Sequence, residues 1–171
     1  MQSNKGVTLV EVIIYIALLG GIAVFLSNFL LYTVNIYQRA RSDREIISNA
    51  RLILETINKS VAQANEVYFP SSKFNDDAGQ LSLITQLGAQ TEHTTAYLDF
   101  WVDNGRVWTK AEGASSAPLS AATVRISRLN FERILQGLNR DAVKIVIQVD
   151  SVSKFPSSIT LNSTMAVRGN Y

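Results

Sequence analysis

The sequence predicts an α+β protein in which one long N-terminal α-helix packs on a C-terminal antiparallel β-sheet. An apolar run continues without proline into an amphipathic helical pattern, and the pattern changes to alternation of period two after residue 70. A length of 171 residues suits one folded unit with one extension. We expect a leader at 1–6, an apolar helical half at 7–34, an amphipathic half at 35–65 and a β-sheet-rich globular domain at 66–171.

Composition argues against several function classes. The net charge is +2 and 18% of residues are charged, below the usual value of about a quarter, so no charged tail points to nucleic acid as a partner. The chain has no cysteine, which excludes disulfides and thiol nucleophiles, and its one histidine is His93, so we expect no metal site and no cofactor. No nucleophile–base pair, phosphate-binding loop or carboxylate dyad is apparent, and we expect no enzymatic activity.

The first element is an apolar segment of membrane-spanning length. From Val7 to Val34 the only charged side chain is Glu11, and the run exceeds the roughly 20 residues that a helix needs to cross the hydrocarbon core. It is also longer than the core of a secretory signal peptide and lacks a small-residue cleavage site, so we expect no cleavage after it. Basic residues such as Lys5 and Arg39 lie on both sides, and their count leaves the orientation open.

The second element is an amphipathic continuation of the same helix. Its apolar positions recur at spacings of three and four residues: Ile46, Ala50, Ile53, Ile57, Val61 and Ala64. A helix from Val7 to about Ala64 would be about 85 Å long. We expect it to end before Tyr68-Phe69-Pro70, because the residue before a proline is disfavoured in helical conformation.

The remaining elements are predicted strands. Alternating or aromatic-rich runs predict strands near 81–85, 97–102, 106–109, 143–149 and 159–167. Asn104-Gly105 separates two of these runs and predicts a tight hairpin, because both residues tolerate positive φ. The Ala-, Ser-, Gly- and Pro-containing segment Ala111–Ala122 predicts a surface loop. We expect a single antiparallel sheet of roughly five to seven strands.

Glu11 is the residue that most requires explanation. A charged side chain at the centre of a bilayer costs about 2.5–3.5 kcal/mol on insertion scales, and less near the edge. In one interpretation Glu11 lies at the membrane interface near the start of the helix, where the positive end of the helix dipole favours a carboxylate. In the other, a neighbouring chain supplies a partner charge.

The residues around Glu11 carry a resemblance to a known family. The segment Gly6-Val7-Thr8-Leu9-Val10-Glu11, at the head of a long apolar helix, resembles the prepilin cleavage and methylation motif of type IV pilins and type II secretion pseudopilins. The resemblance implies that prepilin peptidase cleaves between Gly6 and Val7 and N-methylates Val7. It also implies that Glu11 pairs with the terminal amine of a neighbouring subunit and thereby sets the axial register of a fibre.

Departures from the usual pattern point to one subgroup of this family. Many members begin the mature chain with phenylalanine where this chain has Val7, and major pilins commonly have a proline midway through the apolar run, which is absent here. Gly20-Gly21 could supply local flexibility instead. These features resemble minor pilins or minor pseudopilins, of the J type, more than a bulk fibre subunit.

The resemblance implies a non-enzymatic structural subunit of a type IV pilus or a type II secretion-like fibre. The expected partners are prepilin peptidase, other pilin or pseudopilin subunits, the inner-membrane assembly platform and, before assembly, membrane lipid. The expected location is the cytoplasmic membrane, crossed once with the sheet domain outside, followed by the fibre. The alternatives are a signal-anchored extracytoplasmic binding module and a competence pilin that contributes to DNA uptake.

Other candidate sites have ordinary structural explanations. Asn75-Asp76-Asp77 and Asp103-Asn104-Gly105 could supply oxygen ligands to calcium, but they lack EF-hand spacing and are typical of turns, so we expect no metal there. Trp101 and Trp108 could form an aromatic platform for DNA or glycan, although cross-strand aromatics more often pack on each other or the core. The arginines of the C-terminal half alternate with acidic residues, which favours a solvated face of mixed charge.

Overall fold

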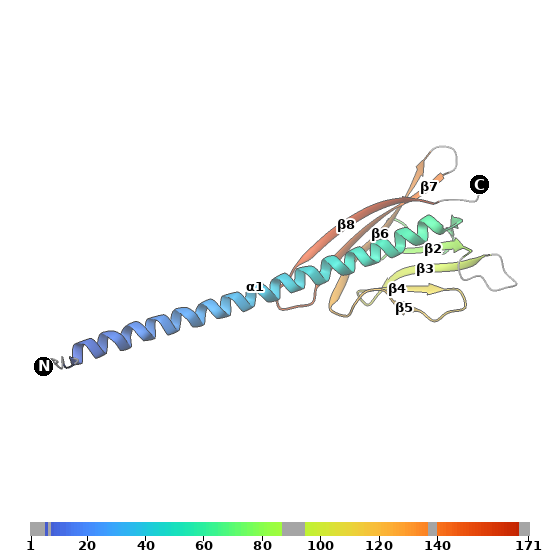
Figure 1. The fold of residues 1–171 in the computed structure, drawn as a ribbon. Helices are drawn as coiled ribbons and strands as arrows, with labels where there is room; N and C mark the ends of the chain where they lie inside the picture. Colours follow the sequence, from blue (N-terminus) through green and yellow to red (C-terminus); the bar gives the residue numbers. More distant parts are fainter. Residues whose placement is uncertain (1–5, 7, 87–94, 137–139, 168–171) are drawn as a thin grey trace. The chain divides into compact units, whose positions relative to one another are not determined.

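The computed structural model describes residues 6, 8–86, 95–136 and 140–167. The helix is α1 (Leu9–Gln63), and the strands are β1 (Glu66–Val67), β2 (Gln80–Thr85), β3 (Ala96–Asp103), β4 (Arg106–Ala111), β5 (Ala117–Pro118), β6 (Val124–Gln136), β7 (Arg140–Ser151) and β8 (Ser158–Ala166), as Figure 1 shows. The chain forms two compact units, residues 1–40 and 41–171. The expected α+β fold, with an N-terminal helix packed on antiparallel sheet, is confirmed.

Within residues 41–171, the C-terminal part of α1 packs on the strands through one stripe. The six predicted apolar positions at 46, 50, 53, 57, 61 and 64 are all buried, with exposed fractions of 0 to 2%. Ser42 and Leu54 are buried beside them. The three-and-four spacing therefore identified the packed face of the helix correctly, because these positions lie above one another on a helix with 3.6 residues per turn.

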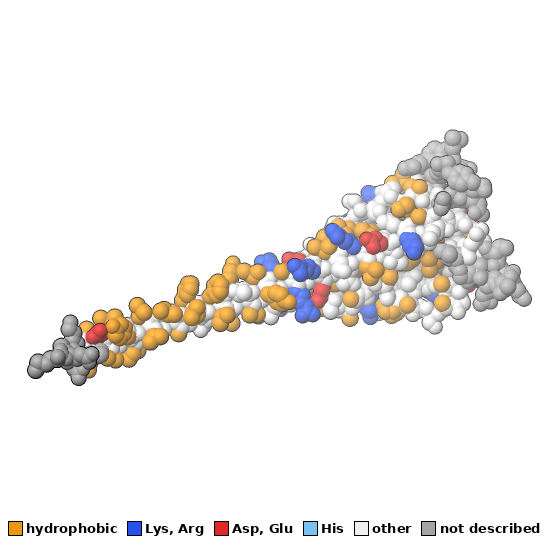
Figure 2. Space-filling view, in the orientation of Figure 1, with side chains coloured by type: hydrophobic (Ala, Val, Ile, Leu, Met, Phe, Trp, Pro, Cys, Tyr) orange, Lys and Arg blue, Asp and Glu red, His pale blue; other side chains and the backbone are white. Residues whose placement is uncertain are grey.

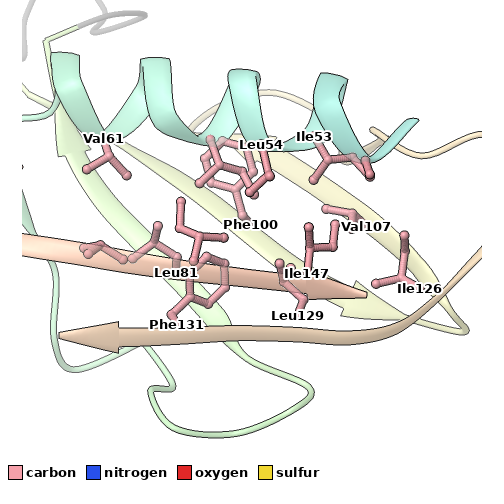
Figure 3. Packing of buried hydrophobic residues seen from close by; sticks show 14 of the residues in the cluster. Ile53, Leu54, Val61, Leu81, Phe100, Val107, Ile126, Leu129, Phe131 and Ile147 are labelled. Atoms are coloured by element: carbon pink, nitrogen blue, oxygen red, sulfur yellow. The ribbon is translucent and has the colours of Figure 1, made fainter. Parts of the chain in front are cut away.

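The strands form two antiparallel sheets, whereas the sequence predicted one. The first has the order β1-β2-β3-β4-β5 and the second β6-β7-β8. The two sheets share one hydrophobic core: Figure 3 shows Ile53, Leu54 and Val61 of the helix above Phe100 of the first sheet and Ile147 of the second. One helical stripe thus covers residues from both sheets.

The predicted hairpin between β3 and β4 is confirmed. Asn104 and Gly105 have φ values of 51° and 71°, and the strands pair with Asp103 opposite Arg106. Positive φ at both central residues is the geometry of a type I′ turn, whose twist matches that of the flanking strands. The register then places Trp101 opposite Trp108.

The longest strand, β6, was not predicted, and the structure supplies the physical reason. Its core residues Val124 and Ile126 are separated by one position, but the next core residues are Leu129 and Phe131. A register shift against β7 between Ile126 and Arg128 inserts one extra residue. Such a bulge breaks the period-two pattern that identifies a strand in sequence.

The segment Ala111–Ala122 lies mostly on the surface, as predicted, with residues 112–118 exposed, but part of it is regular structure. It contains β5, which pairs with β4, and a buried Ser120 with 3% of its surface exposed. The Ser120 hydroxyl accepts a hydrogen bond from the Val107 N–H at 3.1 Å, and its carbonyl accepts one from Arg106 at 2.9 Å. These bonds secure the segment to the end of the first sheet.

Candidate functional site

Thr8 caps the start of α1. Its hydroxyl oxygen accepts a hydrogen bond from the Glu11 N–H at 3.3 Å, and its carbonyl accepts the Val12 N–H at 3.2 Å. A side-chain oxygen at the N-cap satisfies one of the helix N–H groups that have no partner within the helix. Thr8-x-x-Glu11 has the spacing of a capping box, so the same two residues that contribute to the prepilin-like motif also define where the helix begins.

Among the residues that the structure describes, the Glu11 carboxylate has one hydrogen-bond donor, which lies on its own helix. The Tyr15 hydroxyl donates to Glu11 Oε1 at 2.9 Å, one helical turn further along. Both side chains are exposed, and Glu11 forms no ion pair with any described residue of the chain. One carboxylate oxygen is therefore available to a partner from outside the described chain.

The first half of α1 carries apolar side chains that the described protein leaves uncovered. Every described side chain from Leu9 to Ala40 is exposed, and hydrophobic side chains dominate the face of this segment in Figure 2. Two of its hydroxyl groups form hydrogen bonds to the helix backbone. Ser27 donates to the Ala23 carbonyl at 2.8 Å, and Thr33 donates to the Phe29 carbonyl at 2.9 Å. The helix is long and apolar enough to cross a membrane, which is compatible with a single-pass anchor.

The prepilin-like motif is only partly described by the structure. Gly6 is exposed and precedes the helix, and Thr8 to Glu11 form its cap and first turn. Val7, the predicted site of cleavage and methylation, lies outside the described residues. The contact of Tyr15 with Glu11 was not predicted from the sequence. The spacing of four residues could have indicated it, because it places both side chains on one helical face.

In the segment Asn75-Asp76-Asp77, which was considered for calcium, both carboxylates pair with basic side chains. Asp76 accepts from the Lys73 ammonium at 2.8 Å, and Asp77 forms an ion pair with Arg128 at 2.7 Å. The Lys73 hydrogen bond, with a second from the Ala78 N–H, holds the pKa of Asp76 below its ordinary value of 3.8. His93, the lone histidine, lies outside the described residues.

Charged residues on the second sheet pair across neighbouring strands. Arg133 binds Asp141 with nitrogen–oxygen distances of 2.8 to 3.1 Å, and the Lys144 ammonium lies 2.8 Å from a Glu132 oxygen. These side chains remain 22 to 40% exposed. They agree with the solvated face of mixed charge that the sequence predicted.

Asp150 belongs to a hydrogen-bonded group on the same sheet. Burial raises the pKa of its carboxyl, but hydrogen bonds led by one from the Ser158 hydroxyl outweigh this and hold the pKa below 3.8. The Ser158 hydroxyl donates to Asp150 Oδ1 at 2.6 Å, and the Gln148 amide donates to the same oxygen at 3.4 Å. Hydrogen bonds to a carboxylate favour its charged form.

Comparisons with models of protein families, with curated proteins and with solved structures find no match to this chain.

Proposed function

We propose that this protein is a minor pilin or minor pseudopilin, a structural subunit that is inserted in the cytoplasmic membrane and then assembled into a fibre through the first half of α1. The observation that carries the proposal is Glu11. It is the only charged side chain on the described apolar segment, it lies in the first turn, and it has no charged partner within the described chain. A neighbouring subunit that supplies a cation would satisfy it.

The physical logic concerns axial register. A carboxylate and an ammonium that are each buried alone in an apolar environment cost several kcal/mol, and pairing them removes much of that cost. If a peptidase removes residues 1–6, the new amine belongs to Val7, four residues before Glu11 in the sequence. We therefore expect the ammonium of one subunit and the carboxylate of the next to pair when their helices are displaced axially by the rise of about four residues, roughly one turn. Any other displacement leaves both charges unpaired in the apolar bundle.

The apolar surface around Glu11 supports the same proposal. Large side chains cover this segment, for example Leu19 at 65%, Phe25 at 69% and Leu31 at 65% exposed. A helix that is apolar on all sides is normally buried in a membrane or among other helices. Lipid covers it before assembly in our proposal, and the helices of neighbouring subunits cover it in the fibre, with the domain of residues 41–171 on the extracytoplasmic side.

The N-terminal mass of the protein, from cells with and without an active prepilin peptidase, tests processing. We expect a chain that begins at methylated Val7 and depends on the peptidase. A chain that keeps residues 1–6 in both cells, while a known substrate is cleaved, would contradict the proposal. The chain contains no cysteine, so a single cysteine introduced in an exposed position of the domain would report its side of the membrane by labelling with a membrane-impermeant reagent.

Charge removal at Glu11 tests assembly separately. In Glu11→Gln the amide oxygen can still accept the Tyr15 hydrogen bond, but the negative charge is lost. We expect normal insertion and processing with at least a tenfold loss of incorporation, equivalent to about 1.4 kcal/mol. Glu55→Gln is the matched control, because Glu55 is an exposed glutamate on the second part of the same helix. Equal incorporation of both variants would remove the role of Glu11 in register.

A signal-anchored binding module is the second candidate, and one observation favours it. The first sheet carries a pocket of about 400 Å³ with tyrosine, acidic and basic side chains in its lining. Such a module would keep its N-terminal residues and act as a monomer. The mass measurement therefore separates the two candidates.

A further inference from the structure

The pocket lies on the outer face of the first sheet, away from the core. Phe100 of β3 and Val107 of β4 are 1% and 0% exposed and point into the core. Successive residues of a strand point to opposite faces. Their neighbours Tyr97, Asp99 and Lys110 therefore lie on the opposite face, where they line the pocket.

Two tyrosine rings form one wall. Tyr68, which follows β1, meets Tyr97 of β3 edge to face, with ring centroids 5.0 Å apart and an angle of 66° between the planes. Tyr97 is 40% exposed, so part of its ring remains available to a ligand. An edge-to-face pair holds both rings in fixed orientation, and this lowers the entropic cost of stacking a ligand on them.

Two carboxylates are held in place beside these rings, and one oxygen of each has no hydrogen-bond donor among the described residues. The Ser82 hydroxyl donates to Asp99 Oδ1 at 2.5 Å, and the Tyr97 N–H donates to Glu112 Oε2 at 3.0 Å. Neither carboxylate forms an ion pair with a described residue. The remaining oxygens can accept hydrogen bonds from a ligand without rearrangement of the side chains.

Lys110 contributes a hydrogen-bond donor and a positive charge to the pocket. It lies directly across the strand pair from Asp99 and lines the same pocket, and its ammonium has no partner among the residues that the structure describes. An ammonium donates three hydrogen bonds and accepts none. The pocket therefore combines a donor, fixed acceptors and exposed aromatic surface.

The aromatic surface continues along the same face. Trp101 and Trp108 are paired across β3 and β4, two residues along from Asp99 and Lys110, and both are half-buried on the outer face. The Arg106 guanidinium lies 5.6 Å from the Trp108 ring centroid. A chain-like ligand that starts in the pocket would meet a second pair of aromatic rings.

We propose that this face binds a neutral oligosaccharide, with one sugar ring stacked on Tyr97 and its hydroxyls bonded to Asp99, Glu112 and Lys110. A pyranose ring presents an apolar C–H face that packs on an aromatic ring, while each hydroxyl both donates and accepts. This inference is independent of fibre assembly, because every residue that it uses lies in the unit of residues 41–171.

The charges of the pocket select among ligand classes. Two carboxylates and one ammonium line it, so a polyanion such as nucleic acid would meet two like charges. A cationic ligand would meet the Lys110 ammonium. A neutral polyhydroxylated ligand uses both kinds of group and repels neither.

Binding of defined oligosaccharides to the full-length protein in detergent micelles tests the proposal. The probes are the neutral hexasaccharides of glucose, N-acetylglucosamine and xylose, with an anionic galacturonate hexamer and single-stranded DNA for comparison. We expect at least one neutral probe to bind at millimolar concentration or below, with a change in tryptophan fluorescence. Failure of all neutral probes, or binding by the anionic probes alone, would overturn the proposal.

Substitutions locate the binding to the pocket. Tyr97→Ala should weaken binding of that probe by at least about tenfold, whereas Tyr97→Phe, which keeps the ring, should lose less. Tyr37→Ala is the matched control, since Tyr37 is a 71% exposed tyrosine on α1, and it should leave binding unchanged. Glu112→Gln removes a charge at an exposed position and should also weaken binding. If neither Tyr97→Ala nor Glu112→Gln alters binding, the proposed site is wrong.

Discussion

The two parts of α1, residues 9–40 and 41–63, belong to one continuous helix but differ in whether the chain buries their apolar side chains. In the first part every described side chain is exposed, including Ile16 at 65% and Leu19 at 65%. In the second part apolar residues recur every three or four positions and are buried. The exposed fractions of Ile46, Ile53 and Ile57 are only 0–2%. The apolar side chains of residues 41–63 are therefore covered by the strands of the same chain, whereas those of residues 9–40 require lipid or another chain to cover them.

This difference shows that the arrangement of apolar residues, rather than their number, determines what covers them. An apolar stripe with a polar opposite face matches one flat partner, and the sheets of the same chain supply it. An apolar surface on all sides needs a surrounding solvent or several neighbours, which a single sheet cannot provide.

The largest effect is expected from matched isoleucine substitutions in the two parts. Ile53→Ala removes a fully buried side chain from the shared core and should lower the free energy of unfolding by about 2–5 kcal/mol. Ile16→Ala makes the same chemical change at a 65% exposed position and should alter it by less than about 0.5 kcal/mol. Both values are measured by denaturant unfolding of the full chain in detergent, followed by the fluorescence of Trp101 and Trp108.

The comparison would fail if both isoleucine variants were equally destabilised. That result would mean that the first part of α1 packs on the domain in solution. A loss confined to Ile53→Ala, by contrast, would confirm that the core ends within the second part of the helix.

The same contrast explains how much of the fold could be predicted from sequence. The helical stripe and the β3–β4 hairpin follow from local rules, namely the spacing of apolar residues and the tolerance of Asn104 and Gly105 for positive φ. The division into two sheets does not, because it depends on which strands pair over long distances in sequence. Strand β6 was hidden for a further reason, since its bulge shifts Leu129 and Phe131 out of phase with Ile126.

The candidate sites divide in a similar way. Thr8 and Glu11 are neighbours on one helical turn, so their positions follow from the sequence once the helix is recognised. Tyr68, Tyr97 and Glu112 line the pocket on the first sheet but come from three separate segments of the chain, and no local sequence pattern predicts that they lie together. Trp101 and Trp108 were recognised as a pair, but only the register shows that they share the outer face with the pocket.

A smaller effect is expected from glycine substitutions in the two units. A Cβ atom at Gly79 would lie 2.8 Å from the Leu129 carbonyl oxygen and 2.9 Å from the Phe131 ring, so Gly79→Ala should destabilise the domain by about 1–3 kcal/mol. Gly21→Ala is the matched control, because nothing lies within 4 Å of its added Cβ. It should leave the unfolding midpoint of the domain unchanged. Equal effects at both glycines would contradict the tight contact between residue 79 and β6.

The smallest effect concerns Asp150, in the domain, and it depends on pH. Because the pKa of Asp150 is held below 3.8 in the folded state, its carboxylate adds stability above that pH, and this contribution disappears as the pH falls through the folded-state pKa. In Asp150→Asn the amide oxygen can still accept from Ser158, but the charge is lost. The substitution should therefore cost up to about 1 kcal/mol near neutral pH, because a hydrogen bond to a charged acceptor is stronger than one to a neutral amide. The difference from the wild type should vanish at a pH of about 2. Ser158→Ala removes the strongest donor to this carboxylate and should change the pH dependence in the same direction. A difference between the wild type and Asp150→Asn that persists unchanged in acid would show that packing, rather than charge, determines the contribution of residue 150.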